Sequence, residues 1–282
     1  MATVAIIGAG DLGGAAAQAL ASRDCVGRIL LVDAAAEVAA GKALDIQQAG
    51  AVCGFHTRLA GTGDLGRIAG CAVCVIADRA GRTPQEWQGD EALSMLVWIV
   101  PGLADAPVVF AGAMQAELLS RAAHEAHVRR ERLIGSSPEA LVSAATAIVA
   151  VEAQCSPTEI RLTVLGTPPA GFVVPWSEAS IGGYALDRVL TSVQLMRIEA
   201  RVARLWPPGP YALGAAAARV AEALVTSSRR SFSVLTQLDG EFGVRHRAGA
   251  LPARLAAGGI VQTRVPALNT RERVQLETAL GA

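Results

Sequence analysis

The chain has 282 residues, of which 52% are hydrophobic, and its 25 basic residues balance 25 acidic ones. This length favours two domains with ample apolar core, and the zero net charge offers no long-range field for nucleic acid or an anionic bilayer. The most apolar window, residues 96–114, contains Pro101, Asp105 and Pro107, so it is a poor membrane-spanning helix and a soluble protein is expected.

The first half opens with a buried-strand pattern followed by a glycine turn. Residues 3–7 are largely β-branched and apolar, as in a central parallel strand. They lead into the turn 8–14 (GAGDLGG) and an alanine-rich helical stretch that runs to about residue 22. A second strand at 28–32 then ends at Asp33. Together these segments predict one complete βαβ unit.

Strands and helices keep alternating as far as about residue 135, which is typical of a doubly wound parallel sheet. The sequence therefore predicts an α/β fold with an N-terminal dinucleotide-binding (Rossmann) domain at residues 1–136. The further elements expected in this half are helix 35–49, strands 56–60 and 71–77, helix 85–100, strand 108–111, helix 117–128 and strand 132–134.

The alternation stops after that point, and a mixed α+β domain is expected at residues 137–282. Its two long helices, 185–205 and 211–227, are candidates for a subunit interface, although an amphipathic core role also explains them. The other elements expected here are helix 138–152, a strand at 159–165, and strands at 232–238, 243–246 and 259–265.

The glycine turn has the spacing of a dinucleotide-binding loop. Gly8 permits a tight turn, Gly10 lets a diphosphate approach the backbone, and Gly13 lets helix and strand pack closely. The N–H groups at the helix start would bind the phosphates. Asp33 is placed to accept the ribose hydroxyls and to repel a 2′-phosphate, which favours NAD over NADP. The cofactor-binding residues expected are Gly8, Gly10, Asp11, Leu12, Gly13 and Asp33.

Two features of this loop region leave alternatives open. The acidic side chain of Asp11 would weaken phosphate binding unless it points to solvent. Lys42 is the only lysine of the chain and so the only amine that could form a Schiff base, although genome composition explains the scarcity of lysine better.

The cysteines indicate a reducing compartment. There are five, an odd number, which does not suit a full set of disulfides. The first residues have the pattern of a buried strand and not that of a signal peptide, so a cytoplasmic protein is expected. Cys71 and Cys74 have C-x-x-C spacing, but they lie in an apolar strand-like run where positions three apart face opposite sides. We interpret them as small core residues, in preference to a metal or redox pair.

The remaining polar candidates have ordinary structural explanations. His124 and His127 could share one helix face and bind a metal, but that helix is rich in charge and a solvated face is the preferred interpretation, so no metal is expected. Ser136, Ser137 and Glu139 could hydrogen-bond a ligand at the sheet edge. We favour a capping role, with Ser137 as the N-cap before Pro138.

Several stretches, in the right order, resemble the lactate/malate dehydrogenase family, nearest its malate-dehydrogenase-like branch. Besides the glycine turn, these are residues 41–46 (GKALDI), 132–135 (RLIG), 257–259 (AGG) and 268–272 (LNTRE). The resemblance implies a homo-oligomer, dimer or tetramer, that binds NAD and a small 2-keto or 2-hydroxy acid. It also implies a histidine that donates the proton, an aspartate that orients it, and two substrate-binding arginines.

Most of those side chains are missing. In the family's mobile loop the chain has Arg82 and Pro84, but Gln88 stands where a second arginine polarises the substrate carbonyl. The orienting aspartate and the carboxylate-binding arginine correspond to Leu141 and Ala144, although Glu139 lies two residues before Leu141.

The histidine region and two cofactor-facing positions also depart from the family pattern. The stretch that should contain the histidine, residues 166–171 (GTPPAG), has none, and an Asn-Pro segment is replaced by residues 112–114. Arg79, beside Asp78, takes the place of a small residue that faces the cofactor, where it would either crowd the nicotinamide side or bind a phosphate. Because such residues act as a unit, we expect negligible turnover of lactate or malate.

Three interpretations follow. The leading one is a family member with catalysis lost or rerouted. The first alternative is an active dehydrogenase that uses displaced residues on another substrate, with Arg82, Arg79 and above all His246 as candidates. The second alternative is a binding or scaffold protein without catalysis.

Overall fold

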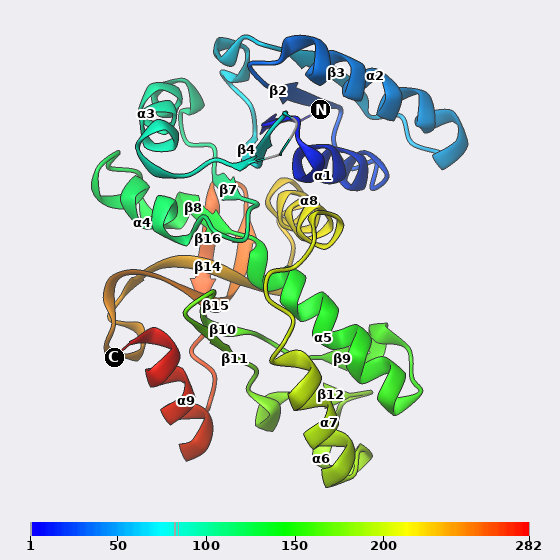
Figure 1. Ribbon diagram of the computed structural model, residues 1–282, viewed down its shortest axis with the longest axis vertical. Coiled ribbons are helices and arrows are strands. Elements are labelled where there is room, and N and C mark those ends of the chain that lie inside the picture. The colour runs from blue at the N-terminus through cyan, green and yellow to red at the C-terminus, as the bar shows by residue number, and fades with distance from the viewer. Residues whose placement is uncertain (1, 82, 84, 282) are drawn as a thin grey trace.

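The computed structural model describes residues 2–81, 83 and 85–281, and it confirms the α/β fold class (Figure 1). In the first half, six parallel strands lie in the order β3-β2-β1-β4-β7-β8. Their bounds are β1 (Thr3–Ile7), β2 (Arg28–Val32), β3 (Arg58–Thr62), β4 (Val73–Ile76), β7 (Val108–Phe110) and β8 (Leu133–Gly135).

Helices cover both faces of this sheet. One face packs against α1 (Asp11–Ala21) and α2 (Ala36–Cys53), and the other against α3 (Gly89–Ile99) and α4 (Ala116–His124). Strands β1 and β4 are almost completely buried, as expected for central strands covered on both sides. Cys71 and Cys74 are buried free cysteines in this core, and burial raises the pKa of the Cys71 thiol to about 11, which confirms their interpretation as core residues.

The second half continues the same sheet and adds helices. β14 (Ser231–Asp239) pairs antiparallel with β8 through Leu235 and Gly135, and β15 (Arg245–Ala256) pairs with β14. The other strands of this half are β9 (Ile160–Arg161), β10 (Leu165–Thr167), β11 (Gly171–Val173), β12 (Ser180–Ile181), β13 (Tyr184–Ala185) and β16 (Gly259–Thr263). Its helices are α5 (Ser137–Ala153), α6 (Leu186–Val189), α7 (Ser192–Val202), α8 (Pro210–Thr226) and α9 (Thr270–Leu280).

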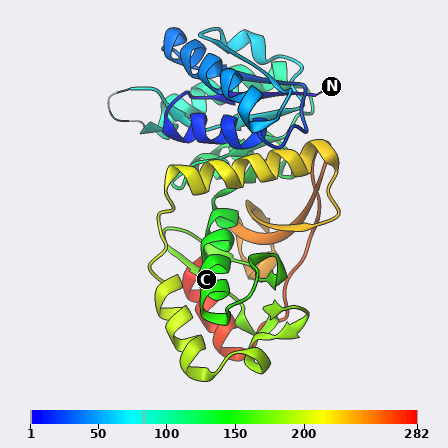
Figure 2. The same cartoon turned by 90° about the vertical axis from the view of Figure 1, so that its right-hand side faces the viewer.

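Helix α8 joins the two halves. In Figure 2 it runs as a yellow bar between α1 above and the green helix α5 below. Its buried alanines belong to the same apolar core as those of α1, and Gly214 lies where any side chain would collide with Ala15 and Ala16. The alanine-rich composition of both helices therefore allows their backbones to approach closely.

Several element predictions were wrong at their boundaries: the helix predicted at 117–128 ends at His124, and the strand predicted at 159–165 is the two short strands β9 and β10. The helix predicted at 185–205 is two helices, because Thr191 accepts the N–H of Gln194 and starts α7. The helix predicted at 85–100 begins only at Gly89. Strand β15 extends ten residues beyond the predicted 243–246, because its glycine, proline and alanines hide the usual strand pattern.

The predicted helix cap at Ser137 was also wrong. The N-cap of α5 is Ser136, which makes no side-chain capping bond, and Ser137 is already helical with Pro138 in the first turn. Within the described part of the chain, no helix is both long and apolar enough to cross a membrane. The domain boundary between residues 136 and 137 stays a prediction.

Candidate functional site

The glycine turn lies where the carboxyl ends of β1, β2 and β4 meet. Gly8 has φ +109°, a conformation that favours glycine, and it leads the chain from β1 towards α1. A side chain at Gly13 would collide with the carbonyl of Gly8, so the close packing of α1 on β1 needs glycine there. The local geometry of the turn is therefore the one that the sequence predicts.

The carboxylate of Asp78 occupies the start of α1. It accepts the backbone N–H of Gly13 at 2.8 Å and that of Leu12 at 3.1 Å, one on each oxygen. The N–H of Gly10 donates to the backbone carbonyl of Asp78 at 3.0 Å. A side chain at Gly10 would collide with the Asp78 carboxylate, so the space that glycine opens in the loop is filled by this side chain.

The electrostatic surroundings suit an anion at this place. The helix start carries a partial positive charge, and the ammonium of Lys42 donates to the carbonyl of Gly10 at 2.7 Å. Burial raises the pKa of the Asp78 carboxyl above its ordinary value, while the N–H groups of Gly13 and Leu12 and the charge of Lys42 lower it. The sequence prediction that this helix start binds an anion fits the geometry, but the anion is the protein's own.

Asp33 is likewise held by backbone groups. Its Oδ2 accepts the N–H of Ala9 and of Ala80, both at 2.8 Å, and its Oδ1 accepts the N–H of Ala35 at 2.9 Å. The side chain is buried. Asp33 therefore ties the glycine turn to the segment after β4, across the place where a ribose was expected.

Arg79 points away from this helix start. Its guanidinium pairs with Glu91 at 2.6 Å and stacks over the Trp87 ring, 4.9 Å from the ring centroid. Asp11, in contrast, is exposed at the first position of α1. The structure thus brings Gly8, Gly10, Leu12, Gly13 and Asp33 together, with Asp78 inserted among them.

A second carboxylate accepts backbone N–H groups in the turn between β7 and α4. Glu86 accepts the N–H groups of Ala113 and Met114, each at 2.8 Å. A side chain at Gly112 would collide with this carboxylate. Burial raises the pKa of the Glu86 carboxyl, although the two N–H groups lower it.

Both carboxylates belong to one hairpin. Its strands are β5 (Asp78–Arg79) and β6 (Gln85–Glu86), and Asp78 is the cross-strand partner of Glu86. Arg82, the predicted candidate in the mobile loop, and Pro84 lie outside the described residues. Gln88 is exposed and precedes α3.

In the second half, the positions that should hold the acid and base are occupied by unreactive groups. Leu141 is buried in the apolar core of α5 and Ala144 is half-buried. The hydroxyl of Thr167 donates to the carbonyl of Ala248 at 2.7 Å. Glu139 is buried and accepts the N–H of Ser233 at 2.9 Å, with Arg219 3.6 Å away. Glu139 therefore serves the packing of α5 on β14 and α8.

His246 lies at the other end of α4. Its Nδ1 is 3.0 Å from Nε2 of His124, whose own Nδ1 contacts the carbonyl of Ser120 at 2.7 Å. Helix α4 separates His246 from the glycine turn. Glu86, the cross-strand partner of Asp78, binds the turn before α4, whereas His246 contacts His124, the last residue of α4. His127 lies beyond α4, and no cluster of three or more potential metal ligands occurs among the described residues.

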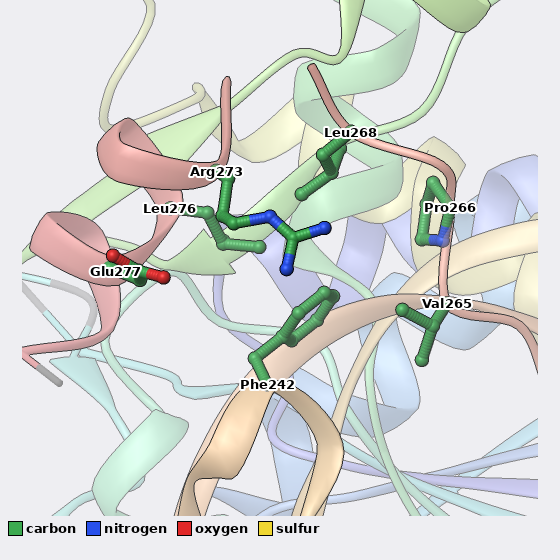
Figure 3. Close-up of a pocket in the computed structure, with 7 residues that line it drawn as sticks. All are labelled: Phe242, Val265, Pro266, Leu268, Arg273, Leu276 and Glu277. Carbon is green, nitrogen blue, oxygen red and sulfur yellow. The ribbon is translucent and has the colours of Figure 1, made fainter. Parts of the chain in front are cut away.

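Two cavities lie in the second half. One, of about 150 Å³, is lined by α9 and by loop residues, with the Arg273 side chain directed between Leu268 and Phe242 (Figure 3). The other, of about 510 Å³, lies among α7, α9 and β11. Neither is lined by a residue of the glycine turn, so we do not assign the predicted cofactor to either.

No protein-family model matches the chain. It does align over nearly its whole length with malate dehydrogenases. That of Salinibacter ruber is 26% identical, covering 99% of this chain and 93% of that protein. That of Cytophaga hutchinsonii is 28% identical, covering 98% and 94%. The solved malate dehydrogenase of Salinibacter ruber superposes with a TM-score of 0.85 at 25% identity, covering 99% of this chain and 94% of that structure.

The chain therefore resembles malate dehydrogenases in sequence and in fold over nearly its whole length. The fold agrees with that of a less similar protein too. A Cryptosporidium parvum lactate dehydrogenase, solved with lactic acid and nicotinamide adenine dinucleotide, has a TM-score of 0.87 at 20% identity over 99% of this chain and 94% of that one. The predicted resemblance to lactate/malate dehydrogenases is thus confirmed.

Within this lactate/malate dehydrogenase fold, sequence reasoning missed the roles of Asp78 and Glu86. A signal was present for the first, since Asp78 follows β4 and lies beside Arg79, which takes the place of a small residue in the family that the chain resembles. For Glu86 the sequence offers no such signal. Its partners, Ala113 and Met114, follow β7, and they come close to Glu86 only because β7 pairs with β4 in the sheet.

Proposed function

We propose that this chain is a non-catalytic member of the lactate/malate dehydrogenase family, with NAD as the nucleotide for which its glycine turn is built. The observation that carries the proposal is the absence of titratable side chains at the expected acid-base positions. Leu141, Ala144 and the stretch 166–171 contain no histidine, acid or arginine. Hydride transfer to a 2-keto acid needs a proton donor within hydrogen-bond reach of the carbonyl.

The side chains that could substitute for the missing ones are engaged elsewhere. Arg79 is paired with Glu91, and His246 contacts His124 at the far end of α4. Both contacts support loss of the reaction over an active dehydrogenase that uses displaced residues. The resemblance still favours a small 2-keto or 2-hydroxy acid as a ligand besides the nucleotide. A cytoplasmic homo-oligomer of two or four chains stays a prediction.

In the described conformation, the residues do not fit the diphosphate of NAD. The N–H groups of Leu12 and Gly13, which would bind it, are donated to Asp78, and Asp33 is bound by three backbone N–H groups. The shape of the turn and the position of Asp33 support NAD as the nucleotide of this fold. Its binding therefore requires a rearrangement of side chains at this site.

The proposal is tested by measuring NADH oxidation with oxaloacetate and with pyruvate, using purified wild-type chain and an active malate dehydrogenase as the positive control. Because the catalytic set acts as a unit, kcat/KM should be at least about a thousandfold below that of the control enzyme. Turnover of either acid within about tenfold of the control would contradict the proposal. A broader panel of 2-keto acids tests the alternative of an active dehydrogenase with another substrate.

A further inference from the structure

We propose that Asp78 is an internal competitor of the nucleotide, so that a diphosphate binds at the start of α1 only when the Asp78 carboxylate leaves the N–H groups of Leu12 and Gly13. This inference rests on the proposed identification of NAD as the nucleotide, and it concerns binding alone. It would survive if the chain proved to be an active enzyme.

The first argument is that both anions need the same donors. Each Asp78 oxygen already accepts one N–H, at 2.8 Å from Gly13 and 3.1 Å from Leu12. A phosphate oxygen at a helix start uses these same N–H groups. The space beside Gly10 is also filled, since even a methyl group there would collide with the carboxylate. The two ligands therefore exclude each other.

The second argument is that the hairpin holding Asp78 is fixed at both ends. The backbone of Ala80 donates to Asp33, and the carboxylate of Glu86 accepts two N–H groups in the turn before α4. Arg79 adds its pair with Glu91. A tethered ligand has a high effective concentration. NADH binds only to molecules in which Asp78 has moved away, so the apparent affinity for NADH is proportional to the fraction of such molecules.

The third argument concerns charge. An ionised Asp78 would repel the two negative charges of the diphosphate. The exposed Asp11 adds a second acidic side chain nearby. Lys42 is close enough to contact the Gly10 carbonyl, and its charge is at present balanced by Asp78. Removing the Asp78 carboxylate would leave Lys42 and the helix start free to attract the nucleotide.

The test compares NADH binding by calorimetric titration in the wild-type chain, Asp78→Ala and Asp78→Asn. We expect the Kd of Asp78→Ala to be at least tenfold lower than that of the wild-type chain. Asp78→Asn, which keeps the shape and removes the charge, should fall between them. Asp11→Ala removes a nearby charge without freeing Leu12 or Gly13, so its gain in affinity should be smaller than that of Asp78→Ala. The exposed Asp105→Ala is the neutral control and should not change Kd.

Inorganic pyrophosphate serves as a second probe, because it carries the diphosphate without ribose or nicotinamide. Its affinity should rise in Asp78→Ala as that of NADH does. Thermal unfolding with and without NADH checks that each variant is folded, and the rise in Tm on adding NADH should be larger in Asp78→Ala than in the wild-type chain.

Three results would overturn the inference. These are a folded Asp78→Ala variant that binds NADH no more tightly than the wild-type chain, an equal gain in Asp11→Ala, or a gain for NADH without one for pyrophosphate. Malate turnover by the wild-type chain would refute the proposed function but leave this comparison of affinities intact.

Discussion

Glu139 is a buried acid with one cation, Arg219, close to its carboxylate. It lies in the first turn of α5, and Arg219 and the N–H of Ser233 only partly offset the loss of water, so burial raises the pKa of the Glu139 carboxyl above its ordinary value of 4.5. Between these two pKa values, the folded chain holds a proton that the unfolded chain releases. The free energy of unfolding therefore falls as pH rises through this range.

Glu139→Gln removes the titration and keeps an oxygen that can accept the N–H of Ser233. We expect the variant to gain stability relative to the wild-type chain as the pH rises above the ordinary value of 4.5, because the unfolded carboxyl then ionises while burial opposes ionisation in the folded chain. Urea unfolding at several pH values measures the difference. A difference that is constant across the whole range would contradict the raised pKa.

At the level of single residues, the sequence predicts which positions form the glycine turn but not what fills it. Gly8, Gly13 and Asp33 could be placed because their spacing follows from one βαβ unit. The contact of Asp78 with Leu12 and Gly13 spans more than sixty residues, and it depends on a side-chain conformation at the neighbouring strand. Local patterns in a sequence contain no information of that kind.

At the level of elements, helix α9 is held by its own first turn. Asn269 accepts the N–H of Glu272, and Glu272 accepts the N–H of Asn269 in return. Glu272 is buried and also accepts the N–H and the hydroxyl of Ser177, at 2.9 and 2.6 Å. One carboxylate therefore links the start of α9 to the loop before β12.

Glu272→Ala should lower the free energy of unfolding by about 2 kcal/mol or more, because it leaves buried donors without an acceptor. Asn269→Ala, which removes only the cap, should cost about 1 kcal/mol. The exposed Glu277→Ala on the same helix is the matched control, with a change within about 0.5 kcal/mol. Denaturant unfolding gives all three values, and equal losses for Glu272→Ala and Glu277→Ala would refute this account.

Element types were easier to predict than element boundaries. The strands β1 and β2 agree with the sequence prediction residue for residue, because apolar runs between turn residues mark them clearly. Strand β6 lies in the segment predicted as the start of a helix, and β5 is not predicted at all. Both strands have only two residues, their own sequence has no strand pattern, and the carboxylates of Asp78 and Glu86 hold them through distant backbone N–H groups.

At the level of the whole molecule, the two halves share one sheet and one helix pair. Gly214 of α8 lies against α1, since a Cβ atom added there would lie 2.7 Å from Ala15 and from the backbone of Ala16. The sequence suggested that α8 could form a subunit interface. In the structure, its buried face covers α1 of the same chain.

Gly214→Ala should destabilise the chain by about 1–3 kcal/mol, because the added methyl group forces α8 away from α1. The matched control is Gly41→Ala in the exposed interior of α2, where a methyl group meets nothing within 4 Å. There the same substitution should stabilise the chain by about 0.5–1 kcal/mol, because it removes a flexible residue from a helix. Thermal unfolding compares the two, and a shift of the same sign in both would exclude close packing as the cause.

The Asp78 carboxylate at the start of α1 has an evolutionary consequence. Emptying the anion site takes one substitution, whereas rebuilding the expected chemistry takes at least four, at Gln88, Leu141, Ala144 and within residues 166–171. A lineage that carries this chain could therefore regain nucleotide binding by one substitution, while catalysis would still require several more. Selection can act on the two properties separately.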